Sequence, residues 1–217
     1  MKERRELPRL VALSPGDLVA STASGFLAQA RAALAAGLPG LMLRESGLSD
    51  RDFLALAREL AGGARGQGAW FCVHDRAHVA LAVSADALHL GFRSLAPTVA
   101  RELCPPSMMI GLSTHDGDGA ARLDGCDYRI HGPVHDTPSK RGLKDAIGFE
   151  GIARALEVST LPLLAIGGLE SAHFHALREL GAHGACARGS VFRAGDAPQD
   201  VARRVEAWLG VVREGAP

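Results

Sequence analysis

Three things are scarce in this chain of 217 residues: cysteine, long apolar runs and an excess of charge of one sign. The four cysteines, Cys72, Cys104, Cys126 and Cys186, form neither a CxxC pair nor the Cys/His spacing of a metal centre. They lie in or near apolar segments. We therefore expect reduced, buried thiols of a cytosolic protein rather than a disulfide framework.

The absence of long apolar runs and of net charge narrows the class of protein. A membrane-spanning helix needs about 20 apolar residues, and no run approaches that length. The first residues are charged and lack the apolar centre of a secretion signal. Lysine plus arginine number 24 and aspartate plus glutamate also number 24, which argues against nucleic acid or an anionic membrane as the main partner. We expect a cytoplasmic protein.

The chain does contain enough apolar residues, 47%, to bury a sizeable core. In residues 1–7, Glu3 and Glu6 are interleaved with basic side chains, which predicts a flexible, solvated N-terminal tail rather than a binding arm. No linker or sharp shift in composition divides the rest. We therefore expect one domain over residues 1–217.

Short apolar runs alternate with helical stretches along the chain, and eight such pairs can be counted. The apolar runs cover residues 7–13, 38–44, 69–75, 87–91, 107–113, 126–132, 161–167 and 182–190. The helical stretches cover residues 25–37, 49–63, 77–85, 96–104, 118–125, 149–158, 171–181 and 198–212. Strands that alternate with helices form a parallel sheet. Eight pairs in this length predict a single (β/α)8 TIM barrel, with an open doubly wound sheet as the alternative.

In a TIM barrel the functional residues lie at the C-terminal ends of the strands. Arg44 closes the second apolar run and either binds an anion or forms a structural ion pair. Asp75 closes the third and either binds a polar group or metal, or caps the next helix. Ser113 and His115 close the fifth, where a histidine among hydroxyls can exchange protons near neutral pH.

The last three apolar runs end in residues that suit a phosphorylated ligand. Hydroxyl and cationic side chains follow the sixth run, within a segment (135–148) that we expect to be a mobile loop. Glycines follow the seventh and eighth runs, where TIM barrels commonly bind phosphate. The candidate ligand-binding residues are Thr137, Ser139 and Lys140 after the sixth run, and Gly167, Gly168, Gly189 and Ser190 as the phosphate cradle.

The order of these segments resembles the thiamine phosphate synthase/TenI superfamily. The segments that carry the resemblance are LRE, HDRAHVALAVSADALHLG, IGLSTH, GPVHDTPSK, AIGG and GSVF. The resemblance implies a TIM barrel that binds a small phosphorylated thiazole at the glycines. It also implies one of two activities. A synthase joins an aminopyrimidine diphosphate to thiazole phosphate with magnesium, whereas a TenI-type tautomerase aromatises the thiazole phosphate by moving a proton.

The departures from the synthase pattern fall where the diphosphate and its metal would bind. The pattern QxRxK reads Met42, Arg44 and Ser46 here, and the pattern HLGQxD has Phe92 for the glutamine and Ser94 for the carboxylate. Because Mg²⁺ prefers carboxylate oxygens and water, these changes weaken the synthase interpretation.

The sequence therefore favours a TenI-like tautomerase without a metal or other cofactor, in which His115 is the acid/base residue. The alternative is a thiamine phosphate synthase that uses Mg²⁺ with Asp75 as a ligand. A second alternative is a binding or regulatory protein that keeps the phosphate site without catalysis. A homo-oligomer is possible in each case.

Overall fold

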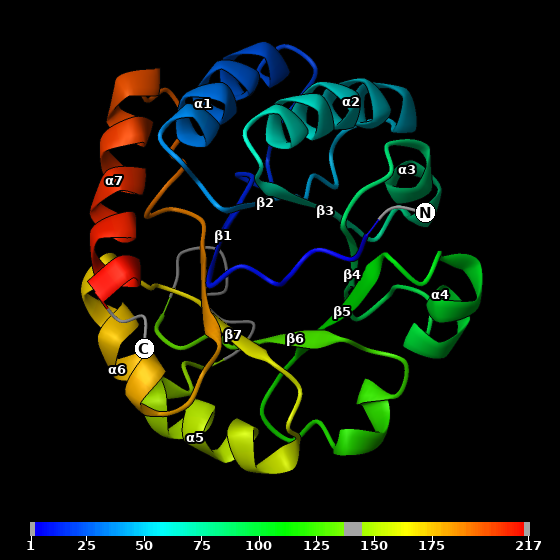
Figure 1. Cartoon of the computed structure of the whole chain (residues 1–217), viewed down its shortest axis with the longest axis vertical. Coiled ribbons are helices and arrows are strands. Elements are labelled where there is room, and N and C mark those ends of the chain that lie inside the picture. The colour runs from blue at the N-terminus through cyan, green and yellow to red at the C-terminus, as the bar shows by residue number, and fades with distance from the viewer. Residues whose placement is uncertain (1–2, 137–144, 215–217) are drawn as a thin grey trace.

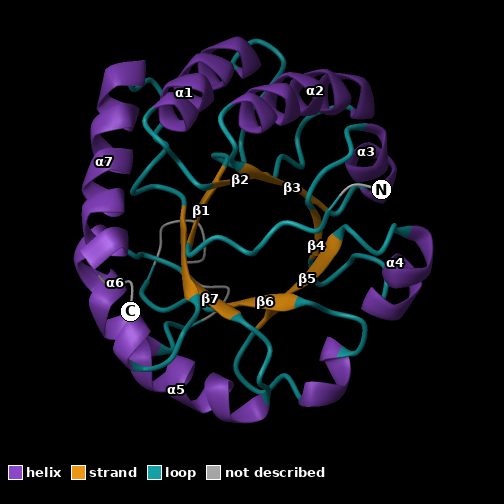
Figure 2. Cartoon of the chain, viewed as in Figure 1, coloured by secondary structure: helices purple, strands orange, loops and turns teal. Residues whose placement is uncertain are grey.

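The computed structural model describes residues 3–136 and 145–214. Its eight strands are parallel and close into a barrel in sequence order, with the helices around the outside (Figure 1, Figure 2). The strands are β1 (Leu10–Leu13), β2 (Gly40–Leu43), β3 (Trp70–His74), β4 (Ala87–Leu90), β5 (Met109–Thr114), β6 (Tyr128–His131), β7 (Leu163–Ile166) and β8 (Gly184–Ala187). The predicted TIM barrel is confirmed, and the doubly wound alternative is excluded.

Each βα unit is completed by a helix or a short helical turn. The α-helices are α1 (Ala23–Ala35), α2 (Asp50–Gly66), α3 (Ala77–Ala82), α4 (Pro97–Leu103), α5 (Gly148–Val158), α6 (Phe174–Glu179) and α7 (Pro198–Glu214). Two segments are 3-10 turns, η1 (Ala120–Leu123) and η2 (Ser171–His173). The predicted helix over 118–125 is therefore only a 3-10 turn. None of the helices described is long and apolar enough to cross a membrane.

The strands are apolar on both faces because both faces are buried, which explains why they read as runs rather than as alternating patterns. One face packs under the helices, and the other fills the barrel. The barrel interior is formed by Leu7, Val11, Leu13, Met42, Trp70, Cys72, Ala87, Met109, Tyr128, Ile130, Leu164 and Cys186. A Cβ on Gly111 would lie 2.1 Å from Cζ of Tyr128, so the glycine makes room for this ring.

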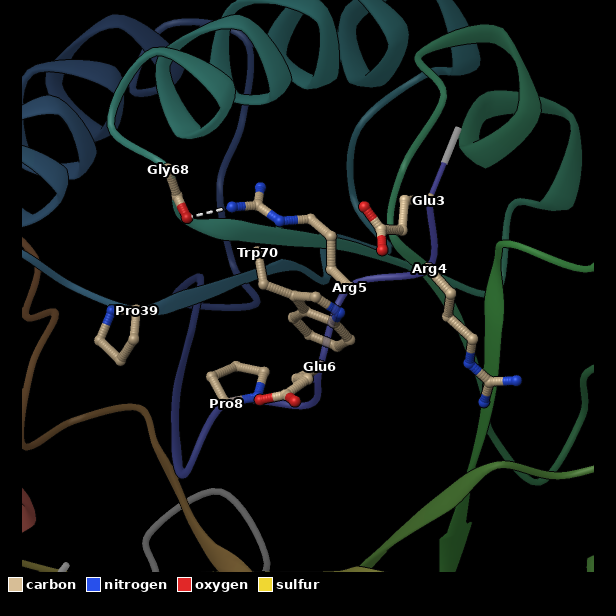
Figure 3. Close-up of a pocket in the computed structure, with 8 residues that line it drawn as sticks. All are labelled: Glu3, Arg4, Arg5, Glu6, Pro8, Pro39, Gly68 and Trp70. Carbon is tan, nitrogen blue, oxygen red and sulfur yellow. Dashed lines mark hydrogen bonds between the residues drawn. The ribbon is translucent and has the colours of Figure 1, made fainter. Parts of the chain in front are cut away.

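The segment predicted to be a solvated tail crosses the N-terminal end of the barrel from residue 3 onward (Figure 3). Arg5 donates hydrogen bonds to the carbonyls of Ala69, at 2.8 Å, and Gly68. Leu7 is buried, and its carbonyl lies 2.9 Å from Nε2 of His183. A cavity of about 400 Å³ remains between this segment and Trp70. Residues 3–7 are therefore packed against the barrel, which differs from the free tail expected from the sequence.

Candidate active site

Five polar side chains gather at the C-terminal mouth of the barrel. Each lies two or four positions after a residue of the barrel interior on its own strand. Because side chains alternate between the two faces of a strand, each is directed to the inner face. We call them the mouth residues; they are Arg44, His74, His89, Ser113 and Arg188.

The two mouth histidines lie side by side; His89 is buried and His74 is half-buried. Their ring centroids lie 5.8 Å apart, and Nε2 of His89 is hydrogen bonded to Oγ of Ser113 at 2.9 Å. Burial, followed by the positive charge of Arg44, lowers the pKa of His74 to about 4. Burial also lowers the pKa of His89 well below its usual value. Both rings are therefore neutral at pH 7, so they can donate and accept hydrogen bonds without adding charge to the mouth.

Acidification is expected to destabilise the protein through these buried rings. Burial also lowers the pKa of His131 to about 4, whereas histidines of the unfolded chain take up protons near pH 6.5. Between these values the unfolded state binds more protons, so the free energy of unfolding falls as the pH falls. Between pH 7.5 and 5.0, His74 and His131 should each contribute a loss of roughly 2 kcal/mol. Urea unfolding at pH 7.5 and at pH 5.0 measures this loss in the free energy of unfolding. His131→Gln should reduce the loss, and equal free energies at both pH values would contradict the argument.

Arg44 is exposed at the end of β2, where the sequence left anion binding and a structural ion pair as alternatives. Among residues 3–136 and 145–214, its guanidinium has no ion pair. The neighbouring acid, Glu45, is buried, and its carboxylate accepts hydrogen bonds from the backbone N–H groups of Gly16 (2.7 Å) and Leu18 (2.9 Å). Glu45 thus holds the loop after β1 in place and leaves Arg44 to the mouth.

Asp75 is exposed directly after β3. Its φ of 68° places it in the left-handed region, where residues other than glycine are uncommon and often belong to functional sites. The N-cap of α3 is Arg76, without a side-chain capping bond, so the carboxylate of Asp75 does not cap this helix. The structure therefore excludes the capping interpretation and leaves the carboxylate at the barrel mouth.

Ser94 and Phe92 follow β4, where the synthase pattern has a carboxylate and a glutamine. The hydroxyl of Ser94 accepts a hydrogen bond from the N–H of Gly91 at 2.7 Å, so this side chain closes the turn after the strand. The side chain of Phe92 is 81% exposed. Ser94 thus makes a structural hydrogen bond, and Phe92 places a large apolar surface beside the mouth.

Packing explains two of the four residues of the predicted phosphate cradle and does not explain the other two. A Cβ on Gly167 would lie 2.7 Å from Cα of Pro133, and one on Gly168 would lie 2.8 Å from Cβ of His135, so the fold itself requires both glycines. A Cβ on Gly189 would meet nothing within 4 Å, so its small size is not explained by packing. The hydroxyl of Ser190 is buried without a hydrogen-bond partner among the described residues. Packing and hydrogen bonding within the described residues therefore do not account for Gly189 and Ser190, and the phosphate cradle stays a prediction.

His115 lies at the edge of the mouth rather than among the five mouth residues. Its Nδ1 donates a hydrogen bond to the carbonyl of Gly132 at 2.8 Å, and its N–H donates to Asp118 at 2.8 Å. The residue lines a small cavity of about 60 Å³, together with His131 and Arg154 of the outer layer. Its role as an acid/base residue stays a prediction.

Sequence reasoning missed Arg188, which follows β8 inside the stretch read as a glycine cradle. A Cβ on Gly16 would lie 3.4 Å from Nη1 of Arg44 and 3.5 Å from Nη1 of Arg188. The two guanidinium groups therefore approach the same turn. No local pattern could have shown this, because it depends on β8 lying next to β1.

Some predicted residues cannot be compared with the structure. Thr137, Ser139 and Lys140 lie outside the described residues, as does most of the expected loop over 135–148. Within the described part of the chain, no three histidine, cysteine or acidic side chains are grouped to hold a metal ion.

The comparisons with known proteins agree with this geometry. The model of the family described as thiamine monophosphate synthase matches residues 16–191, which is most of the chain. The protein belongs to this family. The thiamine-phosphate synthase of Mycobacterium tuberculosis is 41% identical over 171 residues, covering 73% of this chain and 77% of the relative. The enzyme of the same name from Moorella thermoacetica is 36% identical over 168 residues, covering 76% and 80%.

A solved structure extends the likeness to the whole chain. The thiamine phosphate pyrophosphorylase of Pyrococcus furiosus superposes with a TM-score of 0.81 at 26% identity, and the match covers 96% of this chain and 97% of that one. The superfamily expected from the sequence is therefore confirmed. Within it, the relatives carry synthase names, which supports the synthase alternative better than the tautomerase that the departures at positions 92 and 94 favoured.

Proposed function

We propose that this protein is a thiamine-phosphate synthase. It would join an aminopyrimidine diphosphate to a thiazole phosphate: the ring nitrogen of the thiazole forms a bond to the methylene carbon of the pyrimidine. The carbon–oxygen bond breaks, and its electron pair leaves with the pyrophosphate. The reaction needs a positively charged site for the leaving group and a separate grip for the thiazole phosphate.

One observation carries this proposal: a chain of this family has, at the mouth of its barrel, an arginine that no acid neutralises within the described residues. Arg44 is available to a phosphate, since its neighbour Glu45 is engaged with backbone N–H groups. A guanidinium binds phosphate oxygens through two parallel hydrogen bonds, so it fixes the position of the leaving group as well as its charge.

The other end of the site would hold the thiazole. Gly189 leaves open space, and Ser190 offers a buried hydroxyl without a partner in the described part of the chain. These groups suit a phosphate approached by backbone N–H groups. Ser113 lies at the end of β5, where it is hydrogen bonded to His89. Its hydroxyl would be offered to either substrate. Thr137, Ser139 and Lys140 stay predicted contributors to this grip.

The residues present fit a magnesium ion that arrives with its substrate. Mg²⁺ is commonly held by one or two carboxylates together with substrate phosphates. Asp75 is an exposed carboxylate at the mouth that makes no capping bond, so it would hold the ion. When bound, the ion neutralises charge on the departing diphosphate. Ser94 is not a second ligand, because its hydroxyl already closes a turn.

A second function, thiazole phosphate tautomerisation, is supported by the two departures after β4. The exposed ring of Phe92 and the engaged hydroxyl of Ser94 remove polar groups from the diphosphate side of the mouth. A tautomerase needs only a phosphate grip and an acid/base group, for which His115 is the candidate. Its Nδ1 donates to a carbonyl, so the neutral ring carries its basic nitrogen at Nε2.

One experiment separates the two functions. The protein is incubated with aminopyrimidine diphosphate, thiazole phosphate and Mg²⁺, and pyrophosphate release is followed over time. We expect turnover at ordinary enzyme rates, on the order of 1 s⁻¹ or faster. A parallel assay supplies only the non-aromatic thiazole tautomer and follows its aromatisation. Aromatisation that depends on His115, with no pyrophosphate release in the first assay, would overturn the synthase proposal.

A further inference from the structure

Two arginine side chains converge on one turn at the barrel mouth. Arg44 follows β2 and Arg188 follows β8, the two strands that flank β1 in the barrel. The turn after β1 contains Gly16, with a φ of 93°. One Nη1 atom of each arginine lies within 3.5 Å of the same point, the Cβ position of Gly16. The two atoms are therefore within about 7 Å of each other.

Two guanidinium groups at this separation repel one another unless an anion lies between them. Within residues 3–136 and 145–214, neither side chain forms an ion pair, whereas arginines such as Arg31, Arg101 and Arg204 pair with a neighbouring acid. The carboxylate of Glu45 is directed to the N–H groups of Gly16 and Leu18. The nearby ring of His74 is neutral at pH 7, so it does not add to the charge. The pair is a built positive site without a counter-charge from the described part of the chain.

The position of the pair points to a ligand other than the thiazole phosphate. Gly189 and Ser190 follow Arg188 in the loop after β8, whereas the arginine pair spans the turn after β1, between β8 and β2. The two Nη1 atoms are at most about 7 Å apart, so one anion can contact both guanidinium groups, and each group binds one phosphoryl unit best. A diphosphate offers one phosphoryl unit to each guanidinium, whereas a monophosphate must share its oxygens between the two.

We propose that Arg188 and Arg44 together bind the diphosphate of the pyrimidine substrate and the pyrophosphate product, with Arg188 as a specificity-determining residue. This inference rests on the proposed synthase function for the identity of the substrate. The diphosphate lies over the turn at Gly16, where a side chain on residue 16 would occupy the space between the two cations. The monophosphate of the second substrate lies in the cradle after β8.

The test measures binding of inorganic pyrophosphate by calorimetry, at a fixed Mg²⁺ concentration, to the wild type and to Arg188→Gln. We expect the dissociation constant for pyrophosphate to rise at least about tenfold, because a charge-assisted pair of hydrogen bonds is lost. The dissociation constant for thiazole phosphate should change less than about twofold. Arg188→Lys keeps the charge without the planar fork, so its dissociation constant for pyrophosphate should lie between those of the wild type and Arg188→Gln.

Arg203→Gln is the matched control. Arg203 is an exposed residue of α7 paired with Asp200 and is not one of the mouth residues, so the same charge is lost outside the proposed anion site. This variant should bind pyrophosphate like the wild type. Thermal unfolding of each variant shows whether it is folded at the temperature of the titration.

The outcomes separate the inference from the proposed function. If the wild type binds pyrophosphate through Arg188 but does not join the two substrates, the anion site stands and the synthase function is wrong. If Arg188→Gln binds pyrophosphate as the wild type does, the inference is wrong even when the enzyme is a synthase. Weaker binding of thiazole phosphate alone would also overturn it, since Arg188 would then belong to the cradle.

Discussion

Replacing Gly132 with alanine is expected to prevent folding or to lower the free energy of unfolding by about 4 kcal/mol or more. A Cβ on this residue would lie 2.0 Å from the carbonyl oxygen of Ile166 and 3.1 Å from its carbonyl carbon. Both atoms belong to the backbone at the end of β7, so no side-chain rotation relieves the clash. Only a shift of β6 against β7 could do so, and that shift would break the barrel pairing.

Urea unfolding followed by circular dichroism measures this loss, with soluble yield as a first readout. Gly25→Ala is the matched control, because a Cβ at this position of α1 would meet nothing within 4 Å. That variant should be as stable as the wild type or more stable by up to about 1 kcal/mol, since alanine favours helix over glycine. The steric argument fails if Gly132→Ala unfolds at the same urea concentration as the wild type.

Replacing Arg44 with glutamine is expected to lower kcat/KM for pyrophosphate release by about 100-fold or more. Arg44 is exposed and makes no ion pair with the described residues, so its removal leaves no buried partner behind. The melting temperature should therefore stay within about 2 °C of the wild type. The expected loss is in catalysis, because the guanidinium is available to stabilise charge on the leaving diphosphate.

Steady-state kinetics with both substrates measures this effect, and Arg44→Lys should recover part of the rate because it restores the charge without the bidentate fork. The control is Arg31→Gln, which removes an exposed arginine of α1 that pairs with Glu59. An Arg44→Gln enzyme with a kcat/KM within about twofold of the wild type would remove Arg44 from the site. A large loss of stability instead would assign it a structural role.

At the strand ends, the local sequence predicts that functional residues are present but not which of them lie together. Arg44 and Asp75 could be predicted because each interrupts an apolar run, and the structure leaves both side chains at the mouth. His115 has the same local signal. The structure nevertheless places it at a separate small cavity, where its Nδ1 donates a hydrogen bond to the carbonyl of Gly132 at 2.8 Å.

The glycines give a second example. Gly167, Gly168 and Gly189 look alike in the sequence, as small residues after strands that bind phosphate in barrels. In the structure, the first two are required by the backbone of the loop after β6, and only Gly189 is free of packing. A sequence motif shows that a residue is small, but not which neighbour requires it to be small.

The sequence by itself determined the barrel, the family and the strand ends at which the chemistry lies. These follow from local signals, since apolar runs buried on both faces and helical periodicity need no knowledge of distant contacts. Only the tertiary structure decided which of these residues meet. Closing the barrel places β8 beside β1, and this brings Arg188 to Arg44 across more than half of the chain. It also places residues 3–7 across the opposite end, where Arg5 and Leu7 find partners that no charge pattern predicts.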